Sequence, residues 1–433
     1  MTNYKNSGIE WIGDIPKNWE VNRLKIVLQE RNENNNPIKT DYILSLTNDR
    51  GVIPYTDKGE IGNKSKDDIS GYKLAYPNDI VLNSMNVIIG SVGISKYYGA
   101  VSPVYYMLKP RYDSDDVRFY NYIFQTKEFQ NRLKGYGNGI LEIRMRIQML
   151  KLNTVELPIP PSEEQFKIAD FLDRKSSQID ALISLEEKEI EKLKEYKQSV
   201  ISEIVVQGLN KTTKMKNIDY FGQVPDNWNI IPLKILFDFG KGLPITKENL
   251  IKNGIKVISY GQIHSKSNKS VEIDDSLYRF VSDEYLDTNQ NSLVHYGDFI
   301  FADTSEDLEG TGDFIHIDNN DTVFAGYHTI SLINKNNTYS NYLAFQFMTD
   351  LWKSQLRSRV NGVKLFSITK RMLSQCFVVL PPQNEQKSIV NALNNKCKCI
   401  DDLIKIKNKK IEELETYKRS MIYEYVTGKK RYI

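Results

Sequence analysis

Two stretches of the sequence share one pattern: Ile159-Pro160-Pro161-Ser162-Glu163-Glu164-Gln165 and Leu380-Pro381-Pro382-Gln383-Asn384-Glu385-Gln386. Each is followed by a long run without Pro or Gly, which ends near Gln207 in the first copy and near Thr427 in the second. The absence of helix breakers predicts two helices of about 45 residues, each spanning roughly 65–70 Å. Ser162 with Gln165 three positions later is typical of an N-cap box, in which Ser caps the helix.

Both predicted helices carry apolar residues along one side, which we call the apolar seam. It comprises Ile179, Leu182, Ile183, Ile190, Leu193, Val200 and Ile204 in the first helix, and Ile400, Leu403, Ile404, Ile411, Leu414, Met421 and Tyr425 in the second. Seven-residue steps within the seam are typical of knobs-into-holes packing. The opposite side is rich in Lys and Glu, as expected for a solvated face. Because a small globule cannot bury so long a seam, we expect these residues to pair the helices, to dock a partner subunit, or both.

The start of each copy is repeated as well. Gly13-Asp14-Ile15-Pro16-Lys17-Asn18-Trp19 matches Gly222-Gln223-Val224-Pro225-Asp226-Asn227-Trp228, with an offset of 209 positions. The Pro-Pro stretches are offset by 221 positions, so the globular part of the second copy is 12 residues longer. Between these ends little aligns except Tyr76-Pro77-Asn78-Asp79-Ile80-Val81 with Tyr296-Gly297-Asp298-Phe299-Ile300-Phe301. A duplicated frame with divergent interiors predicts one scaffold that carries two different surfaces.

The segments before the long helices mix strand and helix signals. Short apolar runs between turn residues, such as Ile80-Val81-Leu82, are typical of strands, whereas 119–133 and 339–356 have helical spacing. The predicted fold is α/β (α+β): two similar mixed domains, each followed by a long helix, with the two helices packed as an antiparallel coiled coil of pseudo-twofold symmetry. The predicted boundaries are a first domain over 1–158, its helix over 159–210, a second domain over 211–379, and the second helix with a tail over 380–433.

Composition excludes several classes of protein. The 433 residues include 58 Lys and Arg against 55 Asp and Glu, and a net charge of +3 excludes a polycationic DNA-coating protein. Three cysteines are too few for a disulfide framework. The sequence shows neither a signal peptide at its start nor an apolar run long enough to span a membrane, so we expect a cytoplasmic protein.

A search for catalytic motifs finds none, and we expect neither a catalytic residue nor a metal site in this chain. The Pro-Pro pairs lack the preceding Asn or Asp of a DNA methyltransferase motif. Glu186-Glu187-Lys188 resembles part of a nuclease motif but falls in a charge run of the first predicted helix. The four histidines have no metal-ligand spacing.

Polar and basic residues suited to nucleic acid gather in turns and just before the Pro-Pro stretches. Arg and Lys suit phosphates, whereas Asn, Gln, Ser and Thr can hydrogen-bond base edges. The candidate DNA-binding residues are Thr47, Asn48, Arg50, Asn83, Ser84, Asn86, Asn138, Arg144 and Arg146 in the first copy, and Tyr260, Gln262, His264, Lys266, Thr304, Ser305, Lys364, Lys370 and Arg371 in the second. Each alone is more often an ordinary surface residue, and only their grouping favours an interface.

The ordered set of motifs resembles the specificity subunit of type I restriction–modification systems. The resemblance is carried by the two Pro-Pro…Glu-Gln helix starts, by the duplicated architecture, and by Ser7-Gly8-Ile9-Glu10-Trp11-Ile12-Gly13-Asp14-Ile15-Pro16 with Trp19. It covers essentially the whole chain. It implies that each globular domain is a target-recognition domain for one half of a bipartite, asymmetric DNA site. It also implies that the helices are spacers whose length sets the gap between the half-sites.

The resemblance further implies a set of partners. These are double-stranded DNA, two modification (methyltransferase) subunits docked on the helices, and restriction (motor–nuclease) subunits, with no membrane involved. The chain itself would need no cofactor, because S-adenosylmethionine would belong to the modification subunits and ATP with Mg to the restriction subunits. It would be a non-catalytic part of a complex that methylates adenine after flipping it out of the duplex.

The sequence leaves two other classes of protein open. One is a stand-alone methyltransferase or nuclease with a degenerate motif, which cofactor binding by the isolated chain would reveal. The other is a coiled-coil tethering protein that binds DNA without sequence preference. Salt-sensitive binding of equal strength on all DNA sequences is the sign expected of such a tether.

Overall fold

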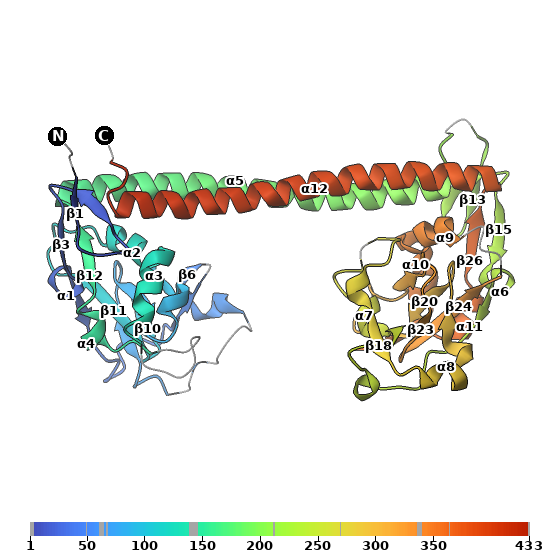
Figure 1. Cartoon of the computed structure of the whole chain (residues 1–433), viewed down its shortest axis with the longest axis horizontal. Coiled ribbons are helices and arrows are strands. Elements are labelled where there is room, and N and C mark those ends of the chain that lie inside the picture. The colour runs from blue at the N-terminus through green and yellow to red at the C-terminus, as the bar shows by residue number, and fades with distance from the viewer. Residues whose placement is uncertain are drawn as a thin grey trace. The chain divides into compact units, whose positions relative to one another are not determined.

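The computed structural model describes residues 4–48, 50–59, 65, 68–137, 146–210, 213–268, 270–335, 340–362 and 364–431. The chain divides into two compact units, unit 1 with residues 1–187 and 408–433, and unit 2 with residues 188–407. Each unit combines a globular part with a stretch of both long helices, α5 (Ser162–Gln207) and α12 (Gln383–Val426) (Figure 1). In the part of the chain that is described, no helix is long and apolar enough to cross a membrane.

The core of unit 1 is an antiparallel sheet with strand order β4-β11-β8-β9. Alternate residues of β8, which we call the central strand of this sheet, face opposite sides. Ile80 and Leu82 pack in the hydrophobic cluster that includes residues of the helices, while Val81 packs against β5 and β6. Because both faces are covered, this strand is a continuous apolar run. The strands of unit 1 are β1 (Tyr4–Asn6), β2 (Asp14–Pro16), β3 (Glu20–Arg23), β4 (Leu28–Arg31), β5 (Leu44–Thr47), β6 (Gly51–Pro54), β7 (Lys73–Ala75), β8 (Ile80–Asn83), β9 (Val92–Ile94), β10 (Gly99–Val101), β11 (Tyr105–Pro110) and β12 (Glu156–Ile159). Its shorter helices are α1 (Leu24–Val27), α2 (Val117–Gln125), α3 (Lys127–Lys134) and α4 (Met149–Leu152), with 3-10 turns η1 (Tyr55–Lys58) and η2 (Val87–Ile89).

Unit 2 repeats this sheet with strand order β16-β24-β20-β22. Phe299 and Phe301 of its central strand face the helices, and Ile300 faces a second sheet, β18-β17-β23-β19, in which β17 and β23 run parallel. The strands of unit 2 are β13 (Met215–Ile218), β14 (Gly222–Pro225), β15 (Asn229–Pro232), β16 (Phe237–Phe239), β17 (Ile255–Ile258), β18 (Arg279–Val281), β19 (Leu293–Val294), β20 (Phe299–Ala302), β21 (Thr304–Ser305), β22 (Phe314–His316), β23 (Val323–Ala325), β24 (Thr329–Asn334), β25 (Phe366–Ser367) and β26 (Phe377–Leu380). Its shorter helices are α6 (Leu233–Leu236), α7 (Tyr260–Ile263), α8 (Glu284–Thr288), α9 (Ser340–Phe347), α10 (Asp350–Arg357) and α11 (Lys370–Ser374), with 3-10 turns η4 (Lys247–Asn249), η5 (Asp275–Leu277) and η6 (Gln290–Ser292).

A buried aspartate turns the chain into the central strand of each sheet. Asp79 in unit 1 accepts a hydrogen bond from the backbone N–H three residues earlier at 2.9 Å, and Asp298 in unit 2 accepts the equivalent bond at 2.8 Å. The residues just before them, Asn78 and Gly297, have φ of 68° and 89°, a conformation that Asn and Gly tolerate. The motif that aligns between the divergent interiors is therefore a structural turn.

The end of each long helix packs on the repeated tryptophan of its unit. Gly428, which follows α12, lies against Trp19 in unit 1, and Gly208, which follows α5, lies against Trp228 in unit 2. Both glycines have positive φ, 71° and 74°, and this left-handed conformation ends the helix. Both tryptophans are buried. Thus α12 completes the core of unit 1, and α5 completes the core of unit 2.

A buried glutamine closes the start of each long helix. The side-chain amide of Gln165 donates to the carbonyl of Pro160 at 3.0 Å, and that of Gln386 donates to the carbonyl of the equivalent proline at 2.7 Å. The expected N-cap box is wrong, because α5 begins at Ser162 itself. The residue before it, Pro161, has no N–H for a glutamine oxygen to accept.

The two long helices pack antiparallel in each unit. In unit 1, Asp180 and Glu186 of α5 pair with Lys418 and Lys410 of α12, so residue numbers rise along one helix as they fall along the other. Unit 2 shows the same arrangement. The predicted fold class, two mixed α/β globular parts with a long helix after each, is confirmed.

Most of the predicted seam is covered in the folded chain. The buried seam residues are Ile179, Ile190, Val200, Ile204, Ile400 and Met421, and the half-buried ones are Ile183, Leu193, Ile404, Ile411, Leu414 and Tyr425. Leu182 and Leu403 differ from these, because they are 45% and 47% exposed. These two leucines occupy equivalent positions, so one exposed apolar site recurs in each unit.

Candidate nucleic-acid interface

In each unit a segment returns across the end of the central strand. Ile147 donates its N–H to the carbonyl of Ser84 at 2.9 Å just after β8, and Ile368 donates to the carbonyl of Asp303 at 2.8 Å just after β20. The bond in unit 1 brings the exposed Arg146 to the strand end. In unit 2, β25 pairs with β21, which lies just after the central strand β20. This pairing brings the segment just before β25 to the end of that strand. Candidate residues that are remote in sequence therefore meet at this edge in both units.

Three candidate residues of unit 1 lie on the turn between β5 and β6. The hydroxyl oxygen of Thr47 accepts a hydrogen bond from the N–H of Arg50 at 3.1 Å and so holds the turn. Asn48 and Arg50 are exposed. The guanidinium of Arg50 also donates to the carbonyl of Asp57 at 3.0 Å, which limits its motion.

The candidates that follow β8 have mainly structural bonds. The side-chain oxygen of Asn83 accepts from the N–H of Met85, and Asn86 is half-buried in the same turn. Ser84 is fully buried and donates its hydroxyl to the carbonyl of Val104 at 2.7 Å, so the structure argues against its direct contact with DNA. Two further candidates, Asn138 and Arg144, lie outside the described residues.

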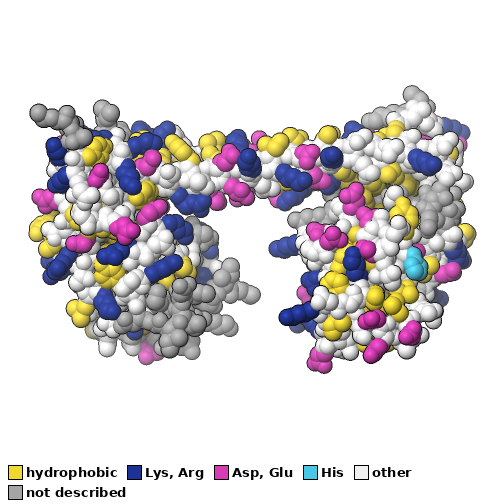
Figure 2. Space-filling view, viewed as in Figure 1, with side chains coloured by type: hydrophobic (Ala, Val, Ile, Leu, Met, Phe, Trp, Pro, Cys, Tyr) yellow, Lys and Arg dark blue, Asp and Glu magenta, His cyan; other side chains and the backbone are white. Residues whose placement is uncertain are grey.

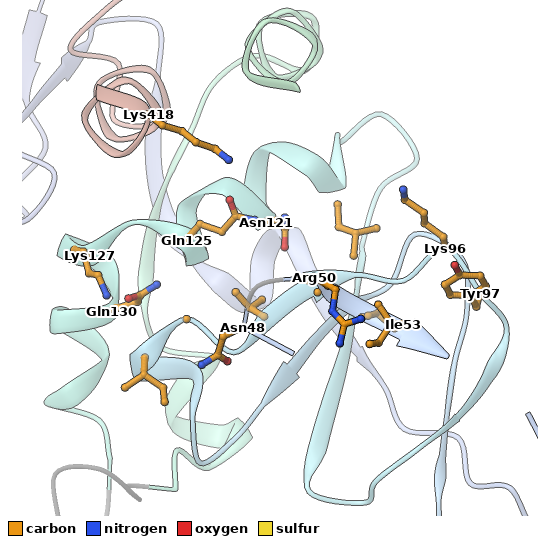
Figure 3. Close-up of a pocket in the computed structure, with 17 residues that line it drawn as sticks. Asn48, Arg50, Ile53, Lys96, Tyr97, Asn121, Gln125, Lys127, Gln130 and Lys418 are labelled. Carbon is orange, nitrogen blue, oxygen red and sulfur yellow. The ribbon is translucent and has the colours of Figure 1, made fainter. Parts of the chain in front are cut away.

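A cavity of about 600 Å³ in unit 1, which we call the basic pocket, lies beneath α12 (Figure 3). It is lined by Asn48, Arg50, Gly51, Val52, Ile53, Ile89, Gly90, Val92, Gly93, Ile94, Lys96, Tyr97, Asn121, Gln125, Lys127, Gln130 and Lys418. Among these described lining residues four are basic and none is acidic. Figure 3 shows that their side chains come from the sheet, from α2 and α3, and from α12, which contributes Lys418.

Two residues that line this pocket each have a buried amide oxygen with no hydrogen-bond partner among the described residues. These oxygens are Oδ1 of Asn121 and Oε1 of Gln130, whose side chains belong to residues 8% and 3% exposed. Gln130 uses its amide nitrogen to bind the carbonyl of Phe124 at 3.0 Å, which fixes the direction of its oxygen. An unpaired buried acceptor costs stability, so these oxygens suit a ligand that brings hydrogen-bond donors.

The helices beside the basic pocket have counterparts in unit 2. Thr126 caps α3 and Thr349 caps α10, each accepting from the N–H three residues later. This match aligns Gln130 with Lys353. Lys353 also lines a cavity of about 480 Å³ in unit 2, so the two cavities occupy corresponding places.

The counterpart cavity has mixed charge where the first is basic. Lys418 of the basic pocket and the corresponding Lys197 of unit 2 both pair with an aspartate at 2.7 Å, but among the described lining residues only the partner in unit 2, Asp401, lines the cavity itself. Lys353 in the same cavity pairs with Asp313. One frame therefore carries two differently charged cavities.

Four candidates of unit 2 meet in another cavity, of about 760 Å³, which we call the acidic pocket. It brings together Tyr260, His264, Thr304 and Ser305 with the carboxylates of Glu306, Asp307, Glu309 and Asp313. Carboxylates repel phosphate but accept hydrogen bonds from the amino group of cytosine. Among the described residues, no group of three or more His, Cys, Asp or Glu could hold a metal ion.

The acidic pocket favours the charged form of His264. Its Nδ1 lies 3.1 Å from Oδ2 of Asp313 and its Nε2 lies 2.9 Å from the carbonyl oxygen of Thr304. Both neighbours are acceptors, so both hydrogen bonds form together when the imidazole is doubly protonated. The hydrogen bond to Asp313 accordingly raises the pKa of His264. Burial alone would raise the pKa of Asp313, but the bond from His264 and the charge of Lys353 lower it.

The remaining candidates of unit 2 are not among the residues that line the acidic pocket. Gln262 accepts from the N–H of Ser259 at 3.1 Å and so stabilises the start of α7. Lys370 donates to the carbonyl of Phe239 at 2.9 Å, and burial lowers its pKa. The other candidates here, Lys266, Lys364 and Arg371, are exposed.

Sequence reasoning predicted only Asn48 and Arg50 of the basic pocket and missed its other lining residues, which include the basic and amide side chains of Lys96, Asn121, Gln125, Lys127, Gln130 and Lys418. A signal for two of them was present. Asn121 and Gln125 stand four positions apart in α2, which places them on one face of that helix. Nothing local marked Lys418, because only the fold brings α12 to this cavity.

The family of the chain follows from a match to a family model. The model for the type I restriction modification DNA specificity domain matches residues 16–195 and again residues 225–418. The chain belongs to this family. Its two matches coincide with the two copies found in the sequence, so each copy is one specificity domain.

Relatives of this specificity subunit extend over nearly its whole length. The MjaVIII type I restriction enzyme specificity subunit of Methanocaldococcus jannaschii is 23% identical over 96% of this chain and 94% of its own. The MjaX specificity subunit of the same organism is 25% identical over 97% and 95%.

Solved structures share the fold at 13% identity. A chain from a study of complex assembly and conformational transition in a type I restriction–modification system has a TM-score of 0.69 over 95% of this chain and 98% of its own. The HsdS subunit of Thermoanaerobacter tengcongensis has a TM-score of 0.51 over 96% and 98%.

Proposed function

We propose that the two units of this specificity subunit recognise two different halves of one asymmetric DNA site. One observation carries the proposal: corresponding cavities in a repeated frame have different polar linings. The described lining of the basic pocket holds Gln130 with Arg50, Lys96 and Lys127 and no carboxylate, whereas its counterpart has Lys353, paired with Asp313, at the position of Gln130. Different linings on one frame suit two different base sequences held in the same way.

The lining of the basic pocket suggests how DNA is held in unit 1. The cations of Arg50, Lys96 and Lys127 suit backbone phosphates, which position the duplex without selecting a sequence. The amide oxygens of Asn121 and Gln130 suit the exocyclic amino group of adenine or cytosine. In unit 2, the carboxylates of the acidic pocket suit the same kind of donor.

The same chain would serve as a scaffold for catalytic subunits. Leu182 and Leu185 in unit 1 and the equivalent Leu403 and Ile406 in unit 2 are all about half or more exposed. Exposed apolar residues at repeated positions suit two copies of one partner, here the modification subunits. S-adenosylmethionine would be bound by those subunits, and ATP with Mg by the restriction subunits. The chain would contribute specificity and assembly but no catalytic group.

A matched pair of variants tests the assignment of half-sites. Gln130→Lys gives unit 1 the residue of unit 2, and Lys353→Gln makes the reverse change. Each variant is produced with the modification subunits in a host, and N6-methyladenine is mapped along the genome. We expect one bipartite motif for the wild type, a change in one half-site for Gln130→Lys, and a change in the other for Lys353→Gln.

The same experiment separates the proposal from the tethering alternative. Loss of methylation at all motifs together, without a change in either half-site, would contradict recognition by separate units. Binding to random DNA as tight as binding to the mapped motif, with the same salt dependence, would instead support a tether without sequence preference.

A further inference from the structure

The apolar seam does not by itself decide which helix pairs with α5. Most seam residues recur unchanged at the 221-position offset, for example Ile179 with Ile400, Leu193 with Leu414, and Ile190 with Ile411. A second copy of α5 would therefore present nearly the same apolar surface as α12. Apolar packing is non-directional and gives little discrimination between such similar partners.

The central ion pairs between the helices, unlike the apolar seam, distinguish α5 from α12. In unit 1, Glu186 of α5 pairs with Lys410 of α12 at 2.5 Å, and the glutamate side chain is only 9% exposed. In unit 2, Glu189 of α5 pairs with Lys407 of α12. Both α5 members are acidic and both α12 members are basic.

The offset of 221 positions shows which charges would meet if two like helices paired. Glu186 corresponds to Lys407, and Glu189 corresponds to Lys410. If α5 paired with a second α5 in the same register, Glu186 would face the Glu189 of the copy. If α12 paired with a second α12, Lys407 would face Lys410. Each wrong pairing thus places like charges together twice.

The outer ion pairs provide an internal comparison. Asp180 pairs with Lys418 in unit 1, and Asp401 pairs with Lys197 in unit 2, all at 2.7 Å. Because Asp180 corresponds to Asp401 and Lys197 to Lys418, these pairs would form equally well in any combination of the helices. Among these four ion pairs, only the central two differ between correct and wrong partners.

We propose that Glu186, Glu189, Lys407 and Lys410 form a charge code that makes α5 pair with α12 and prevents pairing between like helices of two copies. The order of synthesis shows why such a code is useful. Residues 208–382 separate the two helices, so α5 waits for α12 while 175 residues are added. At about 5–20 residues per second this wait lasts roughly 10–35 s, during which another α5 is the available partner.

Two full-length variants separate the code from ordinary stabilisation. Glu189→Lys with Lys407→Glu keeps both central ion pairs within the chain, but it also lets like helices of two copies form them. Reversing all four charges (E186K/E189K/K407E/K410E) keeps the ion pairs and keeps the discrimination. Both variants have the net charge of the wild type, so a difference between them reports the pattern alone.

The measurement is the fraction of dimer after each chain is unfolded in denaturant and refolded at several chain concentrations, by size-exclusion chromatography with light scattering. We expect the two-residue variant to dimerise about tenfold or more tightly than the wild type at low ionic strength. The four-residue variant should match the wild type, and the difference should shrink in ~1 M salt. Equal dimer fractions for all three chains would overturn the charge code.

A charge-clash variant tests that the central pairs act in the folded chain. E186K/E189K places Lys at all four central positions. We expect its melting temperature to fall by about 3–6 °C at low ionic strength, and the four-residue reversal to restore it. An unchanged melting temperature for E186K/E189K would show that these pairs exert no force on helix pairing and would overturn the proposal.

Discussion

At the scale of single residues, Asn121 and Gln130 line the basic pocket although the missing hydrogen bond of each amide oxygen lowers the stability of the fold. Their unpaired oxygens belong to residues that are nine-tenths or more buried. We expect Asn121→Leu to leave the free energy of unfolding unchanged or to raise it by about 1 kcal/mol, because an unpaired buried acceptor is removed. We expect the same variant to weaken binding to the cognate site about 10–100-fold, measured by DNA titration of the assembled complex.

A buried glutamine of unit 2 is the control for this prediction. Both ends of the Gln346 amide are bonded, its nitrogen to the carbonyl of Val379 and its oxygen to the N–H of the same residue. Gln346→Leu should therefore lower the free energy of unfolding by about 2 kcal/mol. If Asn121→Leu destabilised the chain as much as Gln346→Leu, the oxygen of Asn121 would have an internal structural role, contrary to the proposed site.

His264 makes the stability of unit 2 depend on pH. Its pKa is raised in the folded chain, so its ion pair with Asp313 stabilises the fold fully below the unfolded pKa of about 6.5, and this contribution is lost as pH rises through the folded pKa. We expect His264→Gln to lower the melting temperature more at pH 5.5 than at pH 8.5. Melting curves across this range test the prediction, and a loss that grows toward alkaline pH would contradict it.

At the scale of elements, the ends of the long helices depend on glycine. A Cβ on Gly428 would lie 2.4 Å from Cδ of Pro16 and 3.2 Å from the ring of Trp19. We expect Gly428→Ala to lower the free energy of unfolding by about 2–4 kcal/mol, from backbone strain and displaced packing together. Chemical denaturation of the full chain measures this loss.

Gly13 isolates the backbone part of that effect. It has the same left-handed conformation, with φ of 70°, but a Cβ there would have no described atom within 4 Å. Gly13→Ala should cost only about 1–2 kcal/mol, the strain of the backbone alone. Equal losses for the two variants would mean that α12 does not need close contact with Trp19.

Most element boundaries were predictable because their causes are local. The Pro-Pro stretch, the closing glycine and the aspartate turn act within a few residues, so a repeat of the sequence is a repeat of the structure. The exception is Gln165, whose role follows from a neighbouring proline that lacks an N–H. The burial of the apolar seam was largely predictable too, except that Leu182 and Leu403 of the seam are exposed.

The cavities were less predictable than the elements because they are tertiary features. The basic pocket takes residues from β6, β9, α2 and α3, which lie between residues 51 and 134, and from α12, which begins only at Gln383. Asn48 and Arg50 were identified by their chemistry, but Ser84 was equally plausible and is buried. A polar residue in a sequence does not reveal whether its bonds go to the backbone or to a ligand, and the fold decides this.

At the scale of the whole molecule, the exposed leucines predict how many partners bind. Leu182→Asp and Leu403→Asp alter equivalent sites in different units. We expect each single variant to retain one modification subunit and the double variant to retain none, measured by the mass of the purified complex. The stability of the free chain should hardly change, because these side chains are about half exposed.

An exposed leucine elsewhere is the control for docking. Leu150 is 79% exposed on the globular part of unit 1, away from the long helices in sequence. Leu150→Asp should leave the mass of the complex unchanged. A complex that keeps both modification subunits with Leu182→Asp and Leu403→Asp combined would contradict docking at these positions.

The packing of the last turn of α12 on Trp19 has a consequence for truncated forms of the chain. Met421, Ile422 and Val426 lie in the same core as Ile12 and Trp19, so the first domain is complete only once α12 has been synthesised. A stop codon or frameshift ahead of Met421 would therefore disable the first domain as well. A truncated product would lack an intact first domain and could not direct methylation by half of its recognition site alone.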